Sequence, residues 1–198
     1  MESLLEKGNY QPINLKKHKE IINAFEVLDN VIGDKEDFDK FLSQIKDQQV
    51  SILLGFNLIN ESKHGLDAKS DSKYLECKQT SVSAKQNSAV FNDTNIDKAY
   101  IFKQEEVIIA LSVSRRLASV AFVVYGSDPK IGSFLEKRII EQTEKSMRRT
   151  QNITLSKLIK DYGFKIKLGD MNKDEVLDYL NTKYPRTFKN FDLEKIIE

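Results

Sequence analysis

The sequence predicts an α/β fold, because strand patterns and helix patterns alternate along one chain of 198 residues. Two apolar runs rich in β-branched residues, 107–113 and 118–125, are typical of central strands that are covered on both faces. The short connection between the two runs indicates an antiparallel pair. Apolar residues at helical spacing over 15–32 and 130–150 predict two long helices beside this sheet.

The rest of the chain adds shorter elements. The first fourteen residues are polar and carry a proline, which suggests a mobile or partner-contacting arm. A second helix is expected from residue 34 or 35 to about 48. The apolar stretch 50–59 predicts a short buried helix that turns at Gly55 into an extended segment. Residues 1–150 are therefore expected to form the core, and 151–198 a small, mainly helical appendage of the same domain.

Composition places the chain among soluble globular proteins. Hydrophobic residues make up 40% and charged residues 31%, and the formal net charge is +1. This near-neutral balance argues against a protein that coats nucleic acid non-specifically. We expect no membrane span and no signal peptide, and the single cysteine fits a reducing compartment, so the expected location is cytoplasmic.

The stretch with the clearest chemical content is the predicted β-hairpin from His64 to Thr80. Residues 65–69 are extended, 70–72 form a turn, and 73–79 alternate as a half-buried strand does. A side-chain period of two puts Glu76 and Lys78 on one face, with Leu75 and Cys77 pointing into the core. Asp67 on the neighbouring strand is expected to lie beside them.

Two carboxylates and one ammonium suit metal-assisted phosphodiester hydrolysis. Mg²⁺ prefers oxygen ligands and takes one or two protein carboxylates together with phosphate oxygens. The lysine orients a water or neutralises charge on the phosphate. A second interpretation is a cross-strand ion pair on an exposed hairpin face. Glu61 and His64, close by in sequence, are either outer ligands or solvated loop residues.

The segment after the hairpin, Ser81 to Asn95, is rich in hydroxyl and amide side chains and is predicted to be a long loop. Asn and Gln side chains pair with adenine, Lys with guanine, and a carboxylate with cytosine, so this loop is a candidate for base readout. Two arginines between the central strands are candidates for phosphate contacts. The predicted DNA-binding residues are Lys85, Gln86, Asn87, Ser88, Asn92, Asp93, Arg115 and Arg116.

The run from Gly65 to Lys78, GLDAKSDSKYLECK, resembles the active-site hairpin of the PD-(D/E)XK nuclease superfamily, and the element order is similar to type II restriction endonucleases. Leu66 stands where that family usually has proline. The resemblance implies a mixed central sheet flanked by helices and Mg²⁺-dependent cleavage of double-stranded DNA by a homodimer. Asp67 and Glu76 would bind the metal with the Cys77 carbonyl, and Lys78 would position the attacking water.

The sequence is also compatible with two other functions. The same fold serves junction resolvases and repair nucleases, which recognise DNA shape rather than base sequence. A non-catalytic DNA-binding protein is the other possibility, and it requires the alignment of Asp67, Glu76 and Lys78 to be accidental.

Overall fold

A computed structural model describes residues 5, 7–28, 39–62, 65–92, 94–116, 119–144 and 150–198. The helices are α1 (Leu15–Leu28), α2 (Asp39–Leu53), α3 (Ile96–Ile101), α4 (Lys130–Glu144), α5 (Leu155–Lys160), α6 (Lys173–Lys183), α7 (Pro185–Phe188) and a 3₁₀ turn (Leu193–Ile196). The strands are β1 (Tyr10–Pro12), β2 (Leu58–Asn60), β3 (Ala68–Ser70), β4 (Lys73–Ser81), β5 (Ser88–Phe91), β6 (Val107–Arg116), β7 (Ser119–Gly126), β8 (Gln151–Thr154) and β9 (Lys165–Leu168).

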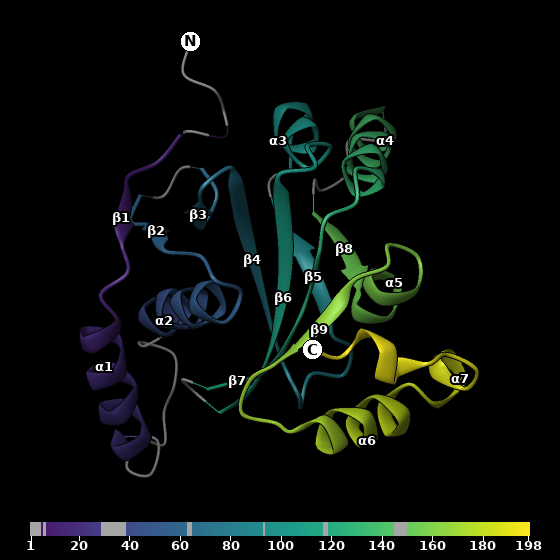
Figure 1. Cartoon of the computed structure of the whole chain (residues 1–198). Helices are drawn as coiled ribbons and strands as arrows, with labels where there is room; N and C mark the ends of the chain where they lie inside the picture. The colour runs from purple at the N-terminus through teal and green to yellow at the C-terminus, as the bar shows by residue number, and fades with distance from the viewer. Residues whose placement is uncertain are drawn as a thin grey trace.

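The main sheet has seven strands in the order β1-β2-β3-β4-β6-β7-β9, and β5 pairs with β8 in a separate two-stranded sheet (Figure 1). The pairing is antiparallel except between β4 and β6, which run parallel and are connected through α3. The chain therefore has the α/β fold that the sequence predicts, with a mixed, mostly antiparallel sheet flanked by helices. The antiparallel pairing of β6 with β7 is also confirmed.

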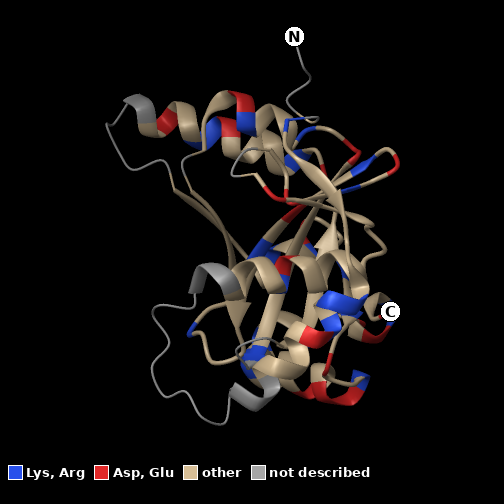
Figure 2. Ribbon diagram, turned by 90° about the vertical axis from the view of Figure 1, so that its left-hand side faces the viewer, with Lys and Arg blue, Asp and Glu red and all other residues tan. Residues whose placement is uncertain are grey.

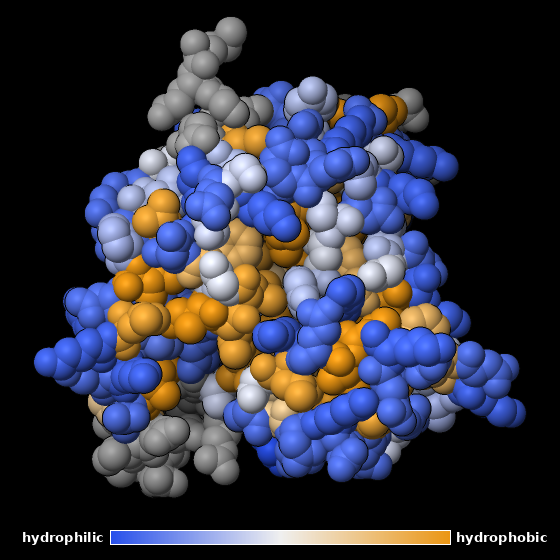
Figure 3. Space-filling model, viewed as in Figure 1, coloured by the Kyte–Doolittle hydropathy of each residue, from blue (hydrophilic) through white to orange (hydrophobic). Residues whose placement is uncertain are grey.

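Helices and a second sheet cover the two faces of the main sheet unequally. On one face, α2 brings Val50 against Leu75 and Cys77 of β4. On the other face, the β5–β8 pair and the later helices build the larger core, which includes Phe91 and Phe122. In Figure 3 apolar side chains are visible in the middle of the face that α2 partly covers, surrounded by hydrophilic ones. Strand β4 thus lies between two packed layers.

Three sequence predictions need correction. Strand β4 is not half-buried, because consecutive residues Tyr74 to Cys77 are all buried. The N-terminal segment does not stay free, since β1 pairs antiparallel with β2 as the edge strand, a position that tolerates Pro12. The segment 81–95 is not one loop, because Ser88–Phe91 forms β5 and pairs with β8.

Helix boundaries also differ from the predicted ones. Helix α2 extends to Leu53, so the short helix expected after residue 50 is the last turn of α2. Gly55, with a φ of +79°, then turns the chain toward β2. Helix α1 ends at Leu28 and α4 at Glu144, and the rest of both predicted helices lies outside the described residues.

The segment 151–198, expected to be a small, mainly helical appendage, contains β8, α5, β9, α6, α7 and the 3₁₀ turn. Its strands join both sheets: β8 completes the small sheet, and β9 is the edge strand next to β7 in the main sheet. A capping box begins α6: the Asn172 side chain accepts from the Glu175 N–H, and the Glu175 carboxylate accepts from the Asn172 N–H. No helix in the described ranges is long and apolar enough to cross a membrane.

Candidate active site at the open edge of strand β4

The β3–β4 hairpin brings Asp67 to the side of β4. The ladder ends at the pair Ala68–Leu75, and the backbone N–H of Asp67, just before β3, donates to the Leu75 carbonyl over 2.8 Å. Asp71 in the turn has a φ of +47°, a conformation that Asp adopts more readily than most residues. Strand β3 has three residues and β4 has nine, so β4 beyond the hairpin has no strand partner on that side in the described part of the chain.

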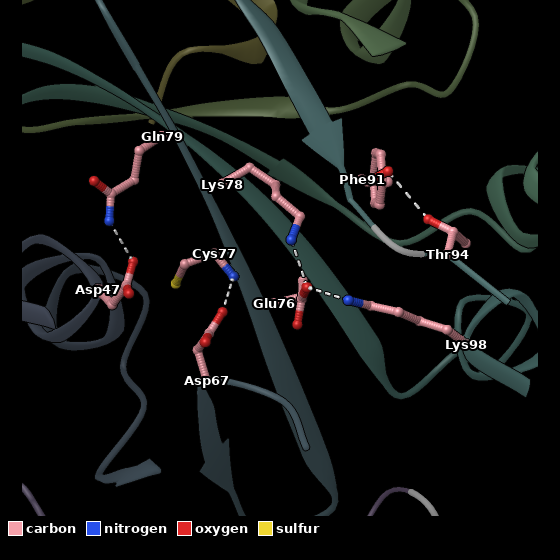
Figure 4. Close-up of polar contacts among 9 residues, drawn as sticks. All are labelled: Asp47, Asp67, Glu76, Cys77, Lys78, Gln79, Phe91, Thr94 and Lys98. Atoms are coloured by element: carbon pink, nitrogen blue, oxygen red, sulfur yellow. Dashed lines mark hydrogen bonds and ion pairs between the residues drawn. The ribbon is translucent and has the colours of Figure 1, made fainter. Parts of the chain in front are cut away.

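The Asp67 carboxylate fills part of this open edge. The Cys77 backbone N–H donates to Asp67 Oδ2 over 2.6 Å, a contact drawn in Figure 4. In an extended strand the N–H and the carbonyl of one residue point to the same side. The Cys77 carbonyl therefore points toward the same edge as Asp67.

Glu76 and Lys78 share a face, as predicted, but that face is covered. Glu76 is only 5% exposed. Lys78 Nζ donates to Glu76 Oε1 over 2.5 Å and stands 5.4 Å from the centre of the Phe91 ring of β5. A second cation, Lys98 of α3, reaches the same Oε1 at 3.8 Å from the more exposed side (Figure 4). The exposed ion pair expected from the alternative interpretation is thus not what the structure shows.

Electrostatics keep Lys78 charged. Burial lowers the pKa of Lys78, but the attraction and the hydrogen bond of Glu76 outweigh this effect, so that the pKa lies above its usual value. Lys78 is consequently an ammonium at neutral pH. It serves as a hydrogen-bond donor and a positive charge rather than as a base.

A third carboxylate, Asp47 of α2, approaches the same strand from the opposite face. Gln79 Nε2 donates to Asp47 Oδ1 over 2.8 Å. Burial is the main reason that the pKa of Asp47 rises to about 6, with repulsion from Glu76 adding to it. Burial, followed by repulsion from Glu76 and Asp47, raises the pKa of Asp67 to about 8. Burial is thus the main cause of both pKa shifts, and repulsion between the carboxylates adds to it.

These residues fit a divalent metal. A cation would offset the repulsion that Glu76 and Asp47 add to the effect of burial on Asp67, and the available donors are hard oxygens of Asp67, Glu76 and the Cys77 backbone. Within the described ranges, no three His, Cys, Asp or Glu side chains form a metal-binding group. The donor set would therefore be two carboxylates and a carbonyl. This is the small protein contribution that Mg²⁺ usually takes, because it keeps several waters.

The predicted base-reading residues are not gathered at this site. Asn87 is fully buried: its Nδ2 donates to Thr80 Oγ1 and to the Ser81 carbonyl, and its Oδ1 accepts from the hydroxyls of Tyr179 and Tyr184. This network holds the β4–β5 connection against α6 and leaves the Asn87 side chain no edge for a base.

The other predicted DNA contacts are scattered. Lys85 and Gln86 are exposed in the β4–β5 turn, and Ser88 is half-buried in β5. Asn92 accepts from Thr150 Oγ1 at 3.4 Å. Arg115 is exposed and pairs with Glu175 at 3.4 Å. Asp93, His64 and the side chain of Arg116 lie outside the described residues.

Charged side chains are spread over the whole molecule. In Figure 2 the acidic and basic residues are interspersed along the helices and strands, and this view shows no separate basic half. A positively charged surface for DNA is therefore restricted to local groups such as Lys78 and Lys98.

Sequence reasoning missed two members of the cluster, Asp47 and Lys98. Asp47 lies in the predicted helix that ends near residue 48, and Lys98 lies in α3. Neither residue has a local sequence pattern that connects it to the hairpin. Only the tertiary arrangement of α2 and α3 around β4 places them at the cluster.

The chain matches no protein-family model, no curated protein and no solved structure.

Proposed function

We propose that the chain is a Mg²⁺-dependent endonuclease that hydrolyses phosphodiester bonds in double-stranded DNA, with an active site of the PD-(D/E)XK kind. The observation that carries the proposal is the pair of contacts at the open edge of β4, where the Asp67 carboxylate accepts from the Cys77 N–H and Lys78 donates to the adjacent Glu76. Buried like charges of this kind, with strongly shifted pKa values, occur preferentially at functional sites.

Each residue has a role in this proposal. Asp67, Glu76 and the Cys77 carbonyl hold the metal. When bound, Mg²⁺ would lower the pKa of a water and stabilise charge on the phosphate oxygens. The Lys78 ammonium orients the attacking water by hydrogen bonding and stabilises the charge that develops on the phosphate. Lys98, on the exposed side of Glu76, binds a phosphate oxygen of the substrate.

A type II restriction endonuclease is the specific activity that the resemblance favours. That activity requires a two-fold homodimer when the cut site is palindromic. One observation favours a second candidate, a structure-specific or repair nuclease with the same chemistry. The segment proposed for base readout is largely β-structure with a buried Asn87, and this removes the main sequence argument for reading bases through that segment.

The test is incubation of purified protein with long, sequence-diverse duplex DNA, with Mg²⁺ or with EDTA, followed by sizing and end-sequencing of the products. Discrete fragments with a common end sequence, formed only with Mg²⁺, support the restriction activity. Preferential cutting of a junction or a damaged duplex supports the second candidate.

Two variants tie the activity to the site. Lys78→Ala should abolish cleavage while DNA binding persists. Lys73→Ala, which removes an exposed lysine from the same strand, should cleave like the native protein. Mg²⁺-dependent cleavage retained by Lys78→Ala would remove the assignment.

A further inference from the structure

A cleft of about 360 Å³ lies directly beside the candidate active site. Helices α1 and α2 form two of its walls, and residues of β1, β2 and the chain just before β3 complete it. Its volume is within the range of small-molecule sites. Asp67 and Asp47 line the cleft, whereas Glu76 and Lys78 do not, so the cleft and the catalytic face share Asp67.

His18 is one of the residues that line this cleft. The residue is only 6% exposed, and its Nδ1 bonds to Gln48 Oε1 over 2.6 Å. A carbonyl oxygen can only accept, so Nδ1 carries the hydrogen and Nε2 of the neutral ring is an acceptor. Among the described residues Nε2 has no hydrogen-bond partner. A ligand that carries an N–H or O–H donor would satisfy the buried Nε2 of His18.

The other lining residues define the chemistry of that ligand. Asp47 Oδ1 and Asp67 Oδ2 are occupied by protein donors, and each carboxylate keeps a second oxygen. Asp47 and Glu61 outnumber Lys17, the one Lys or Arg side chain among the described lining residues, so the cleft does not favour an anion such as phosphate. Ile21, Ile45 and Ile59 provide apolar surface between these polar groups. A flat, uncharged ring with N–H donors at its edge satisfies all three conditions.

We propose that this cleft binds one unpaired nucleobase of the nucleic-acid strand whose phosphate lies at Asp67 and Glu76. The inference rests on the proposed function, since the phosphodiester chain brings the base to the cleft. Enzymes that act on an extruded base hold it between apolar side chains and read its hydrogen-bonding edge. Here His18 Nε2 and the free oxygen of Asp47 accept from the amino or ring N–H groups of the base, while Asp67 stays with the metal.

The experiment compares two probes of equal length and charge, a single-stranded oligodeoxynucleotide and an abasic sugar–phosphate strand. Binding is measured by fluorescence anisotropy in the presence of Ca²⁺, which like Mg²⁺ takes oxygen ligands. Only measurements in which the probe stays uncleaved are used. The native protein should bind the base-containing strand about tenfold more tightly than the abasic one, because the abasic strand leaves the hydrogen-bonding groups of the cleft without a partner.

Variants locate the contact. Gln44→Trp places an indole at the rim of the cleft and should remove the difference between the probes without weakening abasic binding. Asn23→Trp, an equally bulky change on the exposed side of α1 away from the cleft, should leave the difference intact. His18→Ala should reduce it, and circular dichroism confirms that each variant is folded.

The outcomes separate the two proposals. Equal affinity of the native protein for both probes overturns the base cleft and leaves the nuclease proposal standing. A loss of both affinities in Gln44→Trp makes the cleft a backbone contact and also overturns the inference. Failure to bind either probe, together with no cleavage of any DNA, overturns both.

Discussion

Replacing Asp67 by Asn should stabilise the metal-free protein at alkaline pH. Burial and the neighbouring carboxylates raise the pKa of Asp67 to about 8 in the folded chain, against 3.8 for the unperturbed group. Between these two values the native state retains a proton that the unfolded chain has released. Raising the pH through this window therefore lowers the free energy of unfolding, and the loss is complete above about pH 8. Asn carries no titrating proton and can still accept from the Cys77 N–H.

The size of the effect follows from the two pKa values. Their difference is about four units, and each unit corresponds to about 1.4 kcal/mol, which gives an upper bound of about 6 kcal/mol. Relaxation and water penetration around buried charges reduce such costs, so we expect Asp67→Asn to gain about 2 to 3 kcal/mol at pH 8.5. At pH 4 the two proteins should have nearly the same stability, because Asp67 is then protonated in the native state.

Urea denaturation in EDTA at pH 4, 6 and 8.5 measures these free energies directly. Asp71→Asn, which neutralises the exposed carboxylate of the same hairpin turn, is the matched control and should follow the native pH dependence. Mg²⁺ at pH 8.5 should then stabilise the native protein, through preferential binding to the folded state, and should stabilise Asp67→Asn far less. The reasoning is refuted if native stability is constant or rises from pH 4 to 8.5, or if Asp67→Asn follows the same curve.

Two further predictions concern Lys98 and Asn87. Lys98→Ala should weaken DNA binding yet raise Mg²⁺ affinity about two- to fivefold, because a partly exposed cation that competes for Glu76 is lost. Calorimetry with Mg²⁺ alone measures the metal affinity, and Lys103→Ala is the control. A lowered metal affinity in Lys98→Ala would contradict the prediction. Asn87→Ala should destabilise the fold by about 2 to 4 kcal/mol, since it leaves buried hydrogen-bonding groups unpaired. Urea denaturation against the exposed Gln86→Ala tests the second prediction, and native-like stability with a selective loss of DNA binding would restore Asn87 as a base contact.

The parts of the fold that could be predicted from sequence are those with a dense local signal. Residues 107–113 and 118–125 are apolar on both sides of the strand, and the hairpin at Asp71 has a turn between two extended runs, so periodicity alone located them. Burial of Tyr74 and Glu76 could not be predicted in this way. It arises because β5 and β8, distant in sequence, pair into a second sheet that covers that face of β4.

The same division applies to the site. Asp67, Glu76 and Lys78 lie within one hairpin, and a period of two sufficed to bring them together. Asp47 and Lys98 reach the strand from α2 and α3, and no local pattern links those helices to β4. The polar segment around Asn87 misled prediction, because amide and hydroxyl groups serve equally well to bond a chain to its own core. Composition does not distinguish a buried network from a binding loop.

The charge balance at β4 argues that the cluster is more than a structural ion pair. The Lys78 ammonium, 2.5 Å from Glu76 Oε1, balances the negative charge of Glu76, so these two residues together carry no net charge. Asp67 and Asp47 add two carboxylates whose hydrogen bonds come from neutral donors, the Cys77 N–H and the Gln79 amide. A structural pair gains nothing from this additional negative charge, which costs stability at every pH above the two pKa values. The proposed Mg²⁺ would restore this balance, at an edge of β4 that has no strand partner among the described residues.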